Sequence, residues 1–120
     1  MAKTILLVDD DVDLLRSVAE LLRGSGYSVV EHSDSEEALE CFRRNEELTC
    51  ILTDIDMPGM DGIFLLSEVR RIRPVADTLL MTGNFDHFGS EALGGVQCLR
   101  KPFSSGELLE ALELCPTVIN

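Results

Sequence analysis

Short apolar runs alternate with helical patterns along this chain of 120 residues, and that alternation limits the folds that it can adopt. Apolar runs of this length between turn signals are typical of strands that are buried on both faces of a sheet. We predict strands at Thr4–Val8, Tyr27–Val30, Cys50–Thr53, Thr78–Met81 and Val96–Arg100. Five strands separated by helices at short loop lengths predict an α/β fold, a doubly wound parallel sheet with right-handed crossovers that place helices on both faces.

The segments between the predicted strands carry helix signals. Asp34-x-x-Glu37 and Ser104-x-x-Glu107 have the spacing of a capping box, in which two side chains satisfy free N–H groups of the first helical turn. Gly89, Gly94 and Gly95 interrupt or follow the segment 85–93, so only a short or mobile helix is expected there. We predict the other helices from Asp11 or Asp13 to about Gly24, from Asp34 to about Asn45, from Ile63 to Ile72 and from Glu107 to Leu114.

Composition predicts one globular domain over residues 1–120, because 45% of the residues are hydrophobic and a packed core is within reach. The formal net charge of −12 argues against direct binding to nucleic acid or to an anionic membrane. No apolar run approaches the roughly 18 residues of a bilayer span, and no signal peptide precedes Lys3, so a cytoplasmic location is expected. The basic clusters are predicted to lie on solvated helix faces: Arg43, Arg44, Arg70, Arg71 and Arg73.

The cysteines and histidines give little support for a zinc site or a disulfide framework. No C-x-x-C pair occurs and no histidine stands at ligand spacing, so small buried thiols are the expected state of Cys41, Cys50, Cys98 and Cys115. His32 and His87 have no recognisable partner residue. The sequence also lacks the motifs of phosphate-binding loops, dinucleotide-binding turns and nucleophile elbows.

Polar side chains stand where the predicted strands end. The third strand runs into Asp54, and a proline and two glycines then mark a loop. The first strand ends in Asp9 and Asp10, the fourth in Thr82 and the fifth in Lys101. Ligands of open parallel sheets gather outside the carboxyl ends of the strands, so we expect these side chains to form one site.

Three carboxylates at one edge of a sheet predict a cation between them. Asp9, Asp10 and Asp54 would repel one another, and oxygen-only ligation of this kind suits Mg²⁺. With a phosphoryl group held there, Lys101 would supply a positive charge, Thr82 a hydroxyl and Asp54 the carboxylate nucleophile. Each feature alone is more often a helix cap, a solvated cluster or a structural residue. Their combination in this order indicates phosphoryl transfer.

In these features the chain resembles the receiver domain of two-component response regulators, chemotaxis regulators included, over essentially its whole length. The resemblance implies the flavodoxin-like version of the fold, with strand order 2-1-3-4-5, and a cis peptide bond before Pro102. The motifs that carry it are Leu7-Val8-Asp9-Asp10, Thr53-Asp54-Ile55-Asp56-Met57-Pro58-Gly59-Met60-Asp61-Gly62, Met81-Thr82-Gly83 and Leu99-Arg100-Lys101-Pro102-Phe103.

The resemblance also implies the chemistry. Asp54 would accept a phosphoryl group from a histidine of a sensor histidine kinase or a histidine phosphotransfer protein. Asp10 and Asp54 would bind Mg²⁺ directly with the main-chain carbonyl of Asp56, and Asp9 would act through water. The chain would be a regulatory phosphoacceptor that slowly removes its own phosphoryl group, not an enzyme with a separate substrate. It would stand alone or belong to a larger regulator or hybrid kinase.

Lys101 would pair first with Asp54 and then with the phosphoryl group, while Thr82 would move in to hydrogen-bond it. Two departures from the family pattern concern this switch. Cys98 stands where many members carry an aromatic residue, and the segment 83–95 is short and rich in glycine. We therefore expect phosphorylation chemistry to be kept, with signalling through rearrangement of the loops at 83–95 or without an output.

Two other functions compete with this interpretation. A pseudo-receiver would keep the fold as an interaction module without being phosphorylated, but the complete set of acidic residues, threonine and lysine argues against it. A Mg²⁺-dependent phosphohydrolase of the haloacid dehalogenase type would use the Asp-x-Asp spacing of Asp54 and Asp56. Those enzymes place this motif after the first strand and need a longer chain, whereas here the motif follows the third predicted strand.

Overall fold

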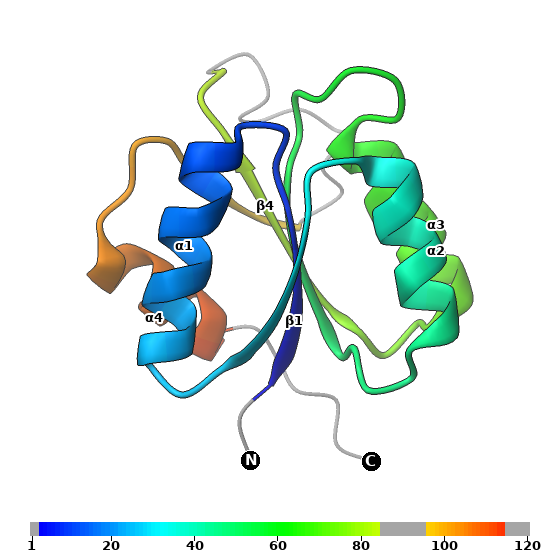
Figure 1. Cartoon of the computed structure of the whole chain (residues 1–120), viewed down its shortest axis with the longest axis horizontal. Coiled ribbons are helices and arrows are strands. Elements are labelled where there is room, and N and C mark those ends of the chain that lie inside the picture. The colour runs from blue at the N-terminus through cyan, green and yellow to red at the C-terminus, as the bar shows by residue number, and fades with distance from the viewer. Residues whose placement is uncertain (1–2, 85–95, 115–120) are drawn as a thin grey trace.

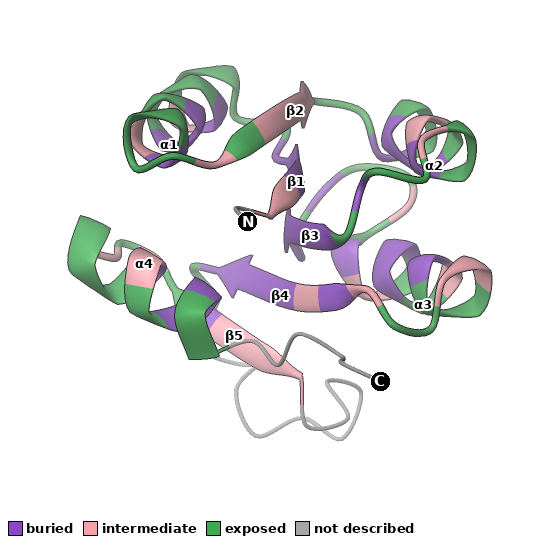
Figure 2. Ribbon diagram, turned by 90° about the horizontal axis from the view of Figure 1, so that it is seen from below, coloured by how far each residue is buried: buried purple, intermediate pink, exposed green. Residues whose placement is uncertain are grey.

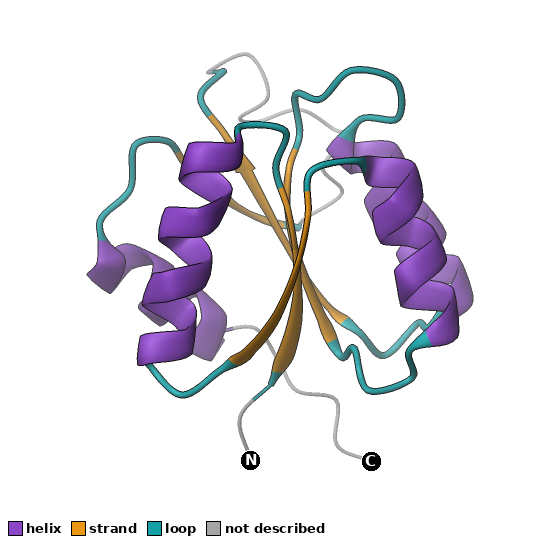
Figure 3. Ribbon diagram, in the orientation of Figure 1, coloured by secondary structure: helices purple, strands orange, loops and turns teal. Residues whose placement is uncertain are grey.

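The computed structural model describes residues 3–84 and 96–114, which form a parallel sheet between two layers of helices (Figure 1). The order β2-β1-β3-β4-β5 and the parallel pairing of every neighbouring pair confirm the predicted fold. Figure 3 shows how the strands and helices alternate. The elements are β1 (Thr4–Val8), α1 (Val12–Gly24), β2 (Ser28–His32), α2 (Ser35–Arg44), β3 (Cys50–Asp54), α3 (Gly62–Ile72), β4 (Asp77–Thr82), β5 (Gln97–Arg100) and α4 (Ser105–Leu114).

The sheet separates two apolar layers, because successive side chains of a strand point to opposite faces. Leu7 packs on the face covered by α1 and α4, in a cluster that includes Leu112. Val8 packs on the other face with Phe42 of α2 and Leu65 of α3. Figure 2 shows the buried central strands between these helical layers. Burial on both faces explains why the predicted strands are apolar at successive positions.

The strand β2 starts later than the sequence predicted. The main-chain N–H of Tyr27 donates to the carbonyl of Leu22, so Tyr27 still belongs to the turn that ends α1. Pairing with β1 begins at Ser28 and continues to His32. The prediction of Tyr27–Val30 was therefore early at both ends. Apolarity alone does not distinguish the last turn of a helix from the first residue of a strand, and the polar Glu31 and His32 at the end of β2 carry no strand signal.

The strands β3 and β4 both extend one residue beyond their predicted ends. Asp54 pairs with Met81, and Thr82 pairs with Arg100. β4 also begins one residue earlier than predicted, and β5 begins one residue later. The consequence concerns function, because the backbones of Asp54 and Thr82 are fixed within the sheet instead of lying in flexible loops.

Most helices begin at the predicted caps. Asp11 caps α1 and Asp34 caps α2, each by accepting the main-chain N–H three residues on. Ser104 and Glu107 exchange side-chain and main-chain hydrogen bonds, which confirms the capping box. Because Ser104 precedes the helix, α4 begins at Ser105, two residues before the predicted start.

Arg73 does not lie on a solvated helix face, contrary to the prediction. Its half-buried guanidinium lies 4.1 Å from the centre of the Phe42 ring and donates to the carbonyls of Leu48 and Phe42. A planar guanidinium can stack on a ring and donate several hydrogen bonds at once, so Arg73 links three segments of the α2–α3 layer. The remaining predicted basic residues are exposed: Arg43, Arg44, Arg70 and Arg71.

Among the described cysteines, Cys50 is fully buried, while Cys41 and Cys98 are half-buried, and all three carry thiols that are not in a disulfide. The segment 85–93, His87 and Cys115 lie outside the described residues. No helix in the described part of the chain has both the length and the apolar character that a membrane crossing requires.

Candidate functional site

The carboxyl ends of four strands bring the predicted site residues to one edge of the sheet. Asp9 follows β1, Asp54 and Thr82 end β3 and β4, and Lys101 follows β5. The residues two positions before Asp9, Asp54 and Lys101 belong to the layer under α1 and α4, so alternation directs these three side chains to that face. Leu80, two positions before Thr82, packs instead on the face that carries α3, so Thr82 points toward that face.

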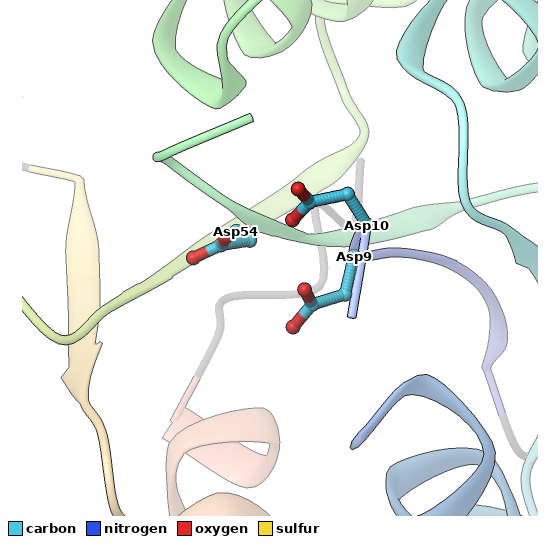
Figure 4. A group of neighbouring side chains, drawn as sticks. All are labelled: Asp9, Asp10 and Asp54. Carbon is cyan, nitrogen blue, oxygen red and sulfur yellow. The ribbon is translucent and has the colours of Figure 1, made fainter. Parts of the chain in front are cut away.

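The carboxylates of Asp9, Asp10 and Asp54 form a compact acidic group. One oxygen of each lies within 4.8 Å of the others. Figure 4 shows the carboxylates of Asp9 and Asp10 reaching toward the side on which Asp54 lies. Asp9 and Asp54 are only 1% and 5% exposed, whereas Asp10 is exposed. The acidic group is therefore enclosed by the protein on one side and open to solvent at Asp10.

Lys101 is the cation of this site. Its Nζ donates to Asp9 Oδ2 over 2.9 Å and lies 3.2 Å from Asp54 Oδ1. Burial lowers the pKa of Lys101, but the hydrogen bond to Asp9 and the negative charges of Asp54 and Asp9 outweigh burial and raise the pKa overall. The second oxygen of Asp9 accepts the main-chain N–H of Asp11 at 3.0 Å. Both oxygens of Asp9 therefore already have protein partners.

The carboxyl of Asp54 is held where its charge is disfavoured. The pKa of Asp54 is raised overall from its usual 3.8 to about 6. Burial is the largest cause, the charge of Lys101 opposes it, and the charges of Asp9 and Asp56 add smaller increases. Asp54 is consequently ionised at neutral pH, but in surroundings that stabilise the anion less well than water. A carboxylate in this state gains from an additional cation or from loss of its negative charge.

The side chain of Asp56 lies apart from the acidic group and contacts Thr82. Thr82 Oγ1 donates to Asp56 Oδ2 over 2.8 Å and accepts the main-chain N–H of Asn84 at 3.0 Å. Within the described residues, the group that could share a metal ion contains no carboxylate from Asp56. The family resemblance implied a role for the main-chain carbonyl of Asp56, and nothing in the sequence indicated this side-chain contact.

Two further residues fix the loop that follows β3. The N–H of Gly62 donates to the carbonyl of Ile55 over 2.9 Å, and a Cβ at Gly62 would lie 2.8 Å from the carbonyl carbon of Asp54. Buried Ser35, at the start of α2, donates to the carbonyl of Met60 over 2.8 Å. The sequence marked Gly62 as a loop residue and gave no signal for Ser35.

Cys98 borders the same part of the sheet as Thr82. Its half-buried side chain packs with Ile55, Leu66 and Leu80. Burial and then the charges of Asp54 and Asp56 raise the pKa of its thiol, so a small neutral side chain fills this position. The peptide bond before Pro102 is cis, as the family resemblance implied. The hypothesis on the loops at 83–95 concerns residues that, beyond 83 and 84, lie outside the described part of the chain.

Comparison with known proteins decides what kind of domain carries this site. The sequence profile described as the response regulator receiver domain matches residues 5–113, a segment that contains all six predicted site residues. The chain belongs to the response regulator receiver domain family. It is thus a receiver domain of the two-component response regulator type, a class of regulatory domains.

Some relatives of this receiver domain are longer proteins, whereas others match it over nearly the whole of their solved chain. The transcriptional regulatory protein CpxR homolog of Haemophilus influenzae is 33% identical over 111 residues, which make up 91% of this chain but 48% of that protein. The chain therefore spans about half the length of that relative. The response regulator TrrA of Thermotoga maritima, solved in complex with Mg²⁺ and BeF, superposes with a TM-score of 0.86 at 28% identity, covering 92% of this chain and 96% of that one. The receiver domain of the hybrid histidine kinase CckA superposes with a TM-score of 0.76 at 36% identity, covering 92% and 95%.

Proposed function

We propose that this receiver domain is a phosphoacceptor and that Asp54 takes a phosphoryl group from a phosphohistidine. The observation that supports this proposal is a buried aspartate at the carboxyl end of a central strand, in contact with a lysine ammonium and beside two further carboxylates. A carboxylate with a disfavoured charge is suited to act as a nucleophile toward phosphorus, because the attack relieves part of that charge.

The transfer needs no change in oxidation state. An oxygen of Asp54 forms a bond to phosphorus while the bond between phosphorus and the histidine nitrogen breaks, and the nitrogen keeps the electron pair. Lys101 then pairs with a phosphoryl oxygen, and the hydroxyl of Thr82 donates to another. Catalysis of this kind consists mainly of positioning the reactants and spreading negative charge over fixed partners.

The acidic group fits Mg²⁺, because its donors are carboxylate oxygens that approach one another and that open to solvent at Asp10. Asp10 and Asp54 would hold the ion directly, with the main-chain carbonyl of Asp56. Asp9 would act through water, in keeping with the partners that its two oxygens already have. When bound, Mg²⁺ neutralises negative charge on the phosphoryl oxygens.

Replacing Lys101 with methionine is expected to strengthen Mg²⁺ binding about three- to tenfold, because the variant removes a positive charge beside two carboxylates of the acidic group. Phosphorylation should become slower in the same variant. Calorimetric titration with Mg²⁺ measures the first effect. Lys3, the only other lysine, pairs with Asp77 at the start of β4, so Lys3→Met is a matched control with unchanged affinity. Weaker Mg²⁺ binding in Lys101→Met would contradict the expectation.

The phosphoryl donor is proposed to be a sensor histidine kinase or a histidine phosphotransfer protein. The donor class agrees with the family, and both kinds of donor present the same phosphorus–nitrogen bond to Asp54. The proposed transfer is the same whether the domain works alone, in a longer regulator such as its curated relatives or in a hybrid kinase.

The experiment that tests this function is phosphorylation by a small phosphodonor such as acetyl phosphate, with Mg²⁺ or with a chelator, followed by intact mass. Wild type should gain one phosphoryl group only when Mg²⁺ is present. Asp54→Asn should gain none, and Asp13→Asn, which removes an exposed carboxylate of α1, should behave as wild type.

Each other outcome points elsewhere. No adduct on folded, Mg²⁺-binding wild type would favour the pseudo-receiver. Labelling of Asp54→Asn would place the nucleophile at another residue. Repeated turnover of a phosphate ester would favour the phosphohydrolase.

A further inference from the structure

The hydrogen bond between Thr82 and Asp56 uses the one proton that the threonine hydroxyl can donate. Thr82 Oγ1 donates to Asp56 Oδ2 over 2.8 Å, and its oxygen accepts the N–H of Asn84 at 3.0 Å. The residue Thr82 is fully buried, while Asp56 is exposed. A hydroxyl that donates to Asp56 cannot donate at the same time to a phosphoryl oxygen on Asp54, since it carries a single hydrogen.

Asp56 is in a position to hold Thr82, because its own backbone is well anchored. The preceding residue, Ile55, donates its N–H to the carbonyl of Met81 and accepts the N–H of Gly62, both over 2.9 Å. Ser35 fixes the loop further along. The carboxylate of Asp56 is therefore carried by a segment that is tied to β4 on one side and to α2 and α3 on the other.

We propose that the Asp56 side chain is a positioning residue that restrains Thr82 in the unphosphorylated arrangement and so opposes its transfer to the phosphoryl group. This inference rests on the proposed function of Asp54. Hydrogen bonds to an ionised carboxylate are stronger than those between neutral groups. Phosphorylation must break this bond before Thr82 can engage the phosphoryl group, so the identity of residue 56 sets how readily the domain switches.

Removing the Asp56 side chain could strengthen phosphoryl binding for a second reason, the loss of its negative charge. The effect of the charge must be separated from the effect of the restraint on Thr82. Its charge is felt at Asp54, where it contributes to the raised pKa, so it would also repel a phosphoryl group directly. Direct repulsion does not involve the Thr82 hydroxyl. A restraint on Thr82, in contrast, disappears when the hydroxyl is removed. A double-mutant cycle between residues 56 and 82 distinguishes the two effects.

The experiment measures the dissociation constant of beryllofluoride, a phosphoryl mimic, at saturating Mg²⁺ in wild type, Asp56→Ala, Thr82→Val and the double variant. Asp56→Ala should bind the mimic about three- to tenfold more tightly than wild type. The same change in the Thr82→Val background should give less than half of that gain on a logarithmic scale. Asp13→Ala, which removes an exposed carboxylate without contact to Thr82, controls for net charge.

A second measurement tests the restraint without Mg²⁺ or the mimic. The amide of Asn84 donates to Thr82 Oγ1, so its hydrogen exchange should become faster in Asp56→Ala when the hydroxyl is released. Equal gains in both backgrounds, weaker binding of the mimic or unchanged Asn84 exchange would each overturn the restraint while leaving the phosphoacceptor in place. Wild type that binds no mimic and takes no label would overturn the phosphoacceptor and this inference together.

Discussion

Gly62→Ala is expected to lower the free energy of unfolding by about 3 kcal/mol and to displace Asp54 from its position in the site. An alanine Cβ would lie 2.8 Å from the carbonyl carbon of Asp54 and 2.9 Å from Cα of Ile55, and closer still to the Asp54 carbonyl oxygen. These are backbone atoms at the end of a buried strand, so accepting the methyl group requires the backbone to shift. The conflict is one of space, not of dihedral angle.

Chemical denaturation measures this loss, and acetyl phosphate labelling measures the consequence for Asp54. Gly24→Ala at the end of α1 is the matched control, because no atom outside its chain neighbours and its own helix backbone lies within 4 Å of the Cβ that it would add. Alanine has the higher helix propensity, so that control should change stability by about 1 kcal/mol or less. A Gly62→Ala variant as stable as wild type would show that the loop after β3 adapts, and would remove the basis for this expectation.

Asp54→Asn is expected to make the metal-free protein more stable at neutral pH by about 2 kcal/mol while removing its proposed activity. The pKa of Asp54 is about 6 in the folded protein and 3.8 is its usual value, so the folded state binds more protons between these pH values. The free energy of unfolding of wild type should therefore fall as the pH rises from about 4 to 6 and stay lower above that range. The asparagine variant lacks this decline, although Lys101 loses one of its two anionic partners in exchange.

Thermal or denaturant unfolding in a chelator from pH 4 to pH 8 tests this expectation. The curves of wild type and Asp54→Asn should lie closest near pH 4 and separate as the pH rises. Asp13→Asn should follow wild type throughout. A ligand that binds the folded state and not the unfolded state adds to stability. Adding Mg²⁺ should therefore stabilise wild type more than the variant, which lacks one of the proposed metal-binding carboxylates. Equal pH dependence in both proteins would mean that the Asp54 charge is not disfavoured in the fold.

The strand order and most of the site could be predicted because their signals are local. An apolar run followed by a carboxylate or hydroxyl identifies a buried strand and the strand end that carries a site residue, as at Asp54 and Thr82. Helix caps such as Asp11 and Ser104 act within one turn, so their spacing is visible in the sequence. The errors at strand ends arose where residue type and pairing disagree, as at the apolar Tyr27, which lies in a turn, and at the polar Asp54 and Thr82, which pair within the sheet.

The remaining features depend on contacts between segments that are distant in the chain. Ser35 contacts Met60 and Arg73 contacts Phe42 across elements that only the complete fold brings together, and neither has a neighbouring residue that signals the contact. The bond from Thr82 to Asp56 spans 26 positions and joins two residues to which the family resemblance gave other partners. A serine, an arginine or an aspartate is common at exposed positions, so residue type alone could not single these out.

The site residues also differ in the face of the sheet from which they extend. Asp9, Asp54 and Lys101 follow strand positions that pack under α1 and α4, while Thr82 follows positions that pack with Leu66 of α3. Substitutions in the first apolar layer should thus act mainly on the chemistry at Asp54, and substitutions in the second mainly on the response of Thr82. Such a domain can change how strongly it responds during evolution without remaking the reaction to which it responds.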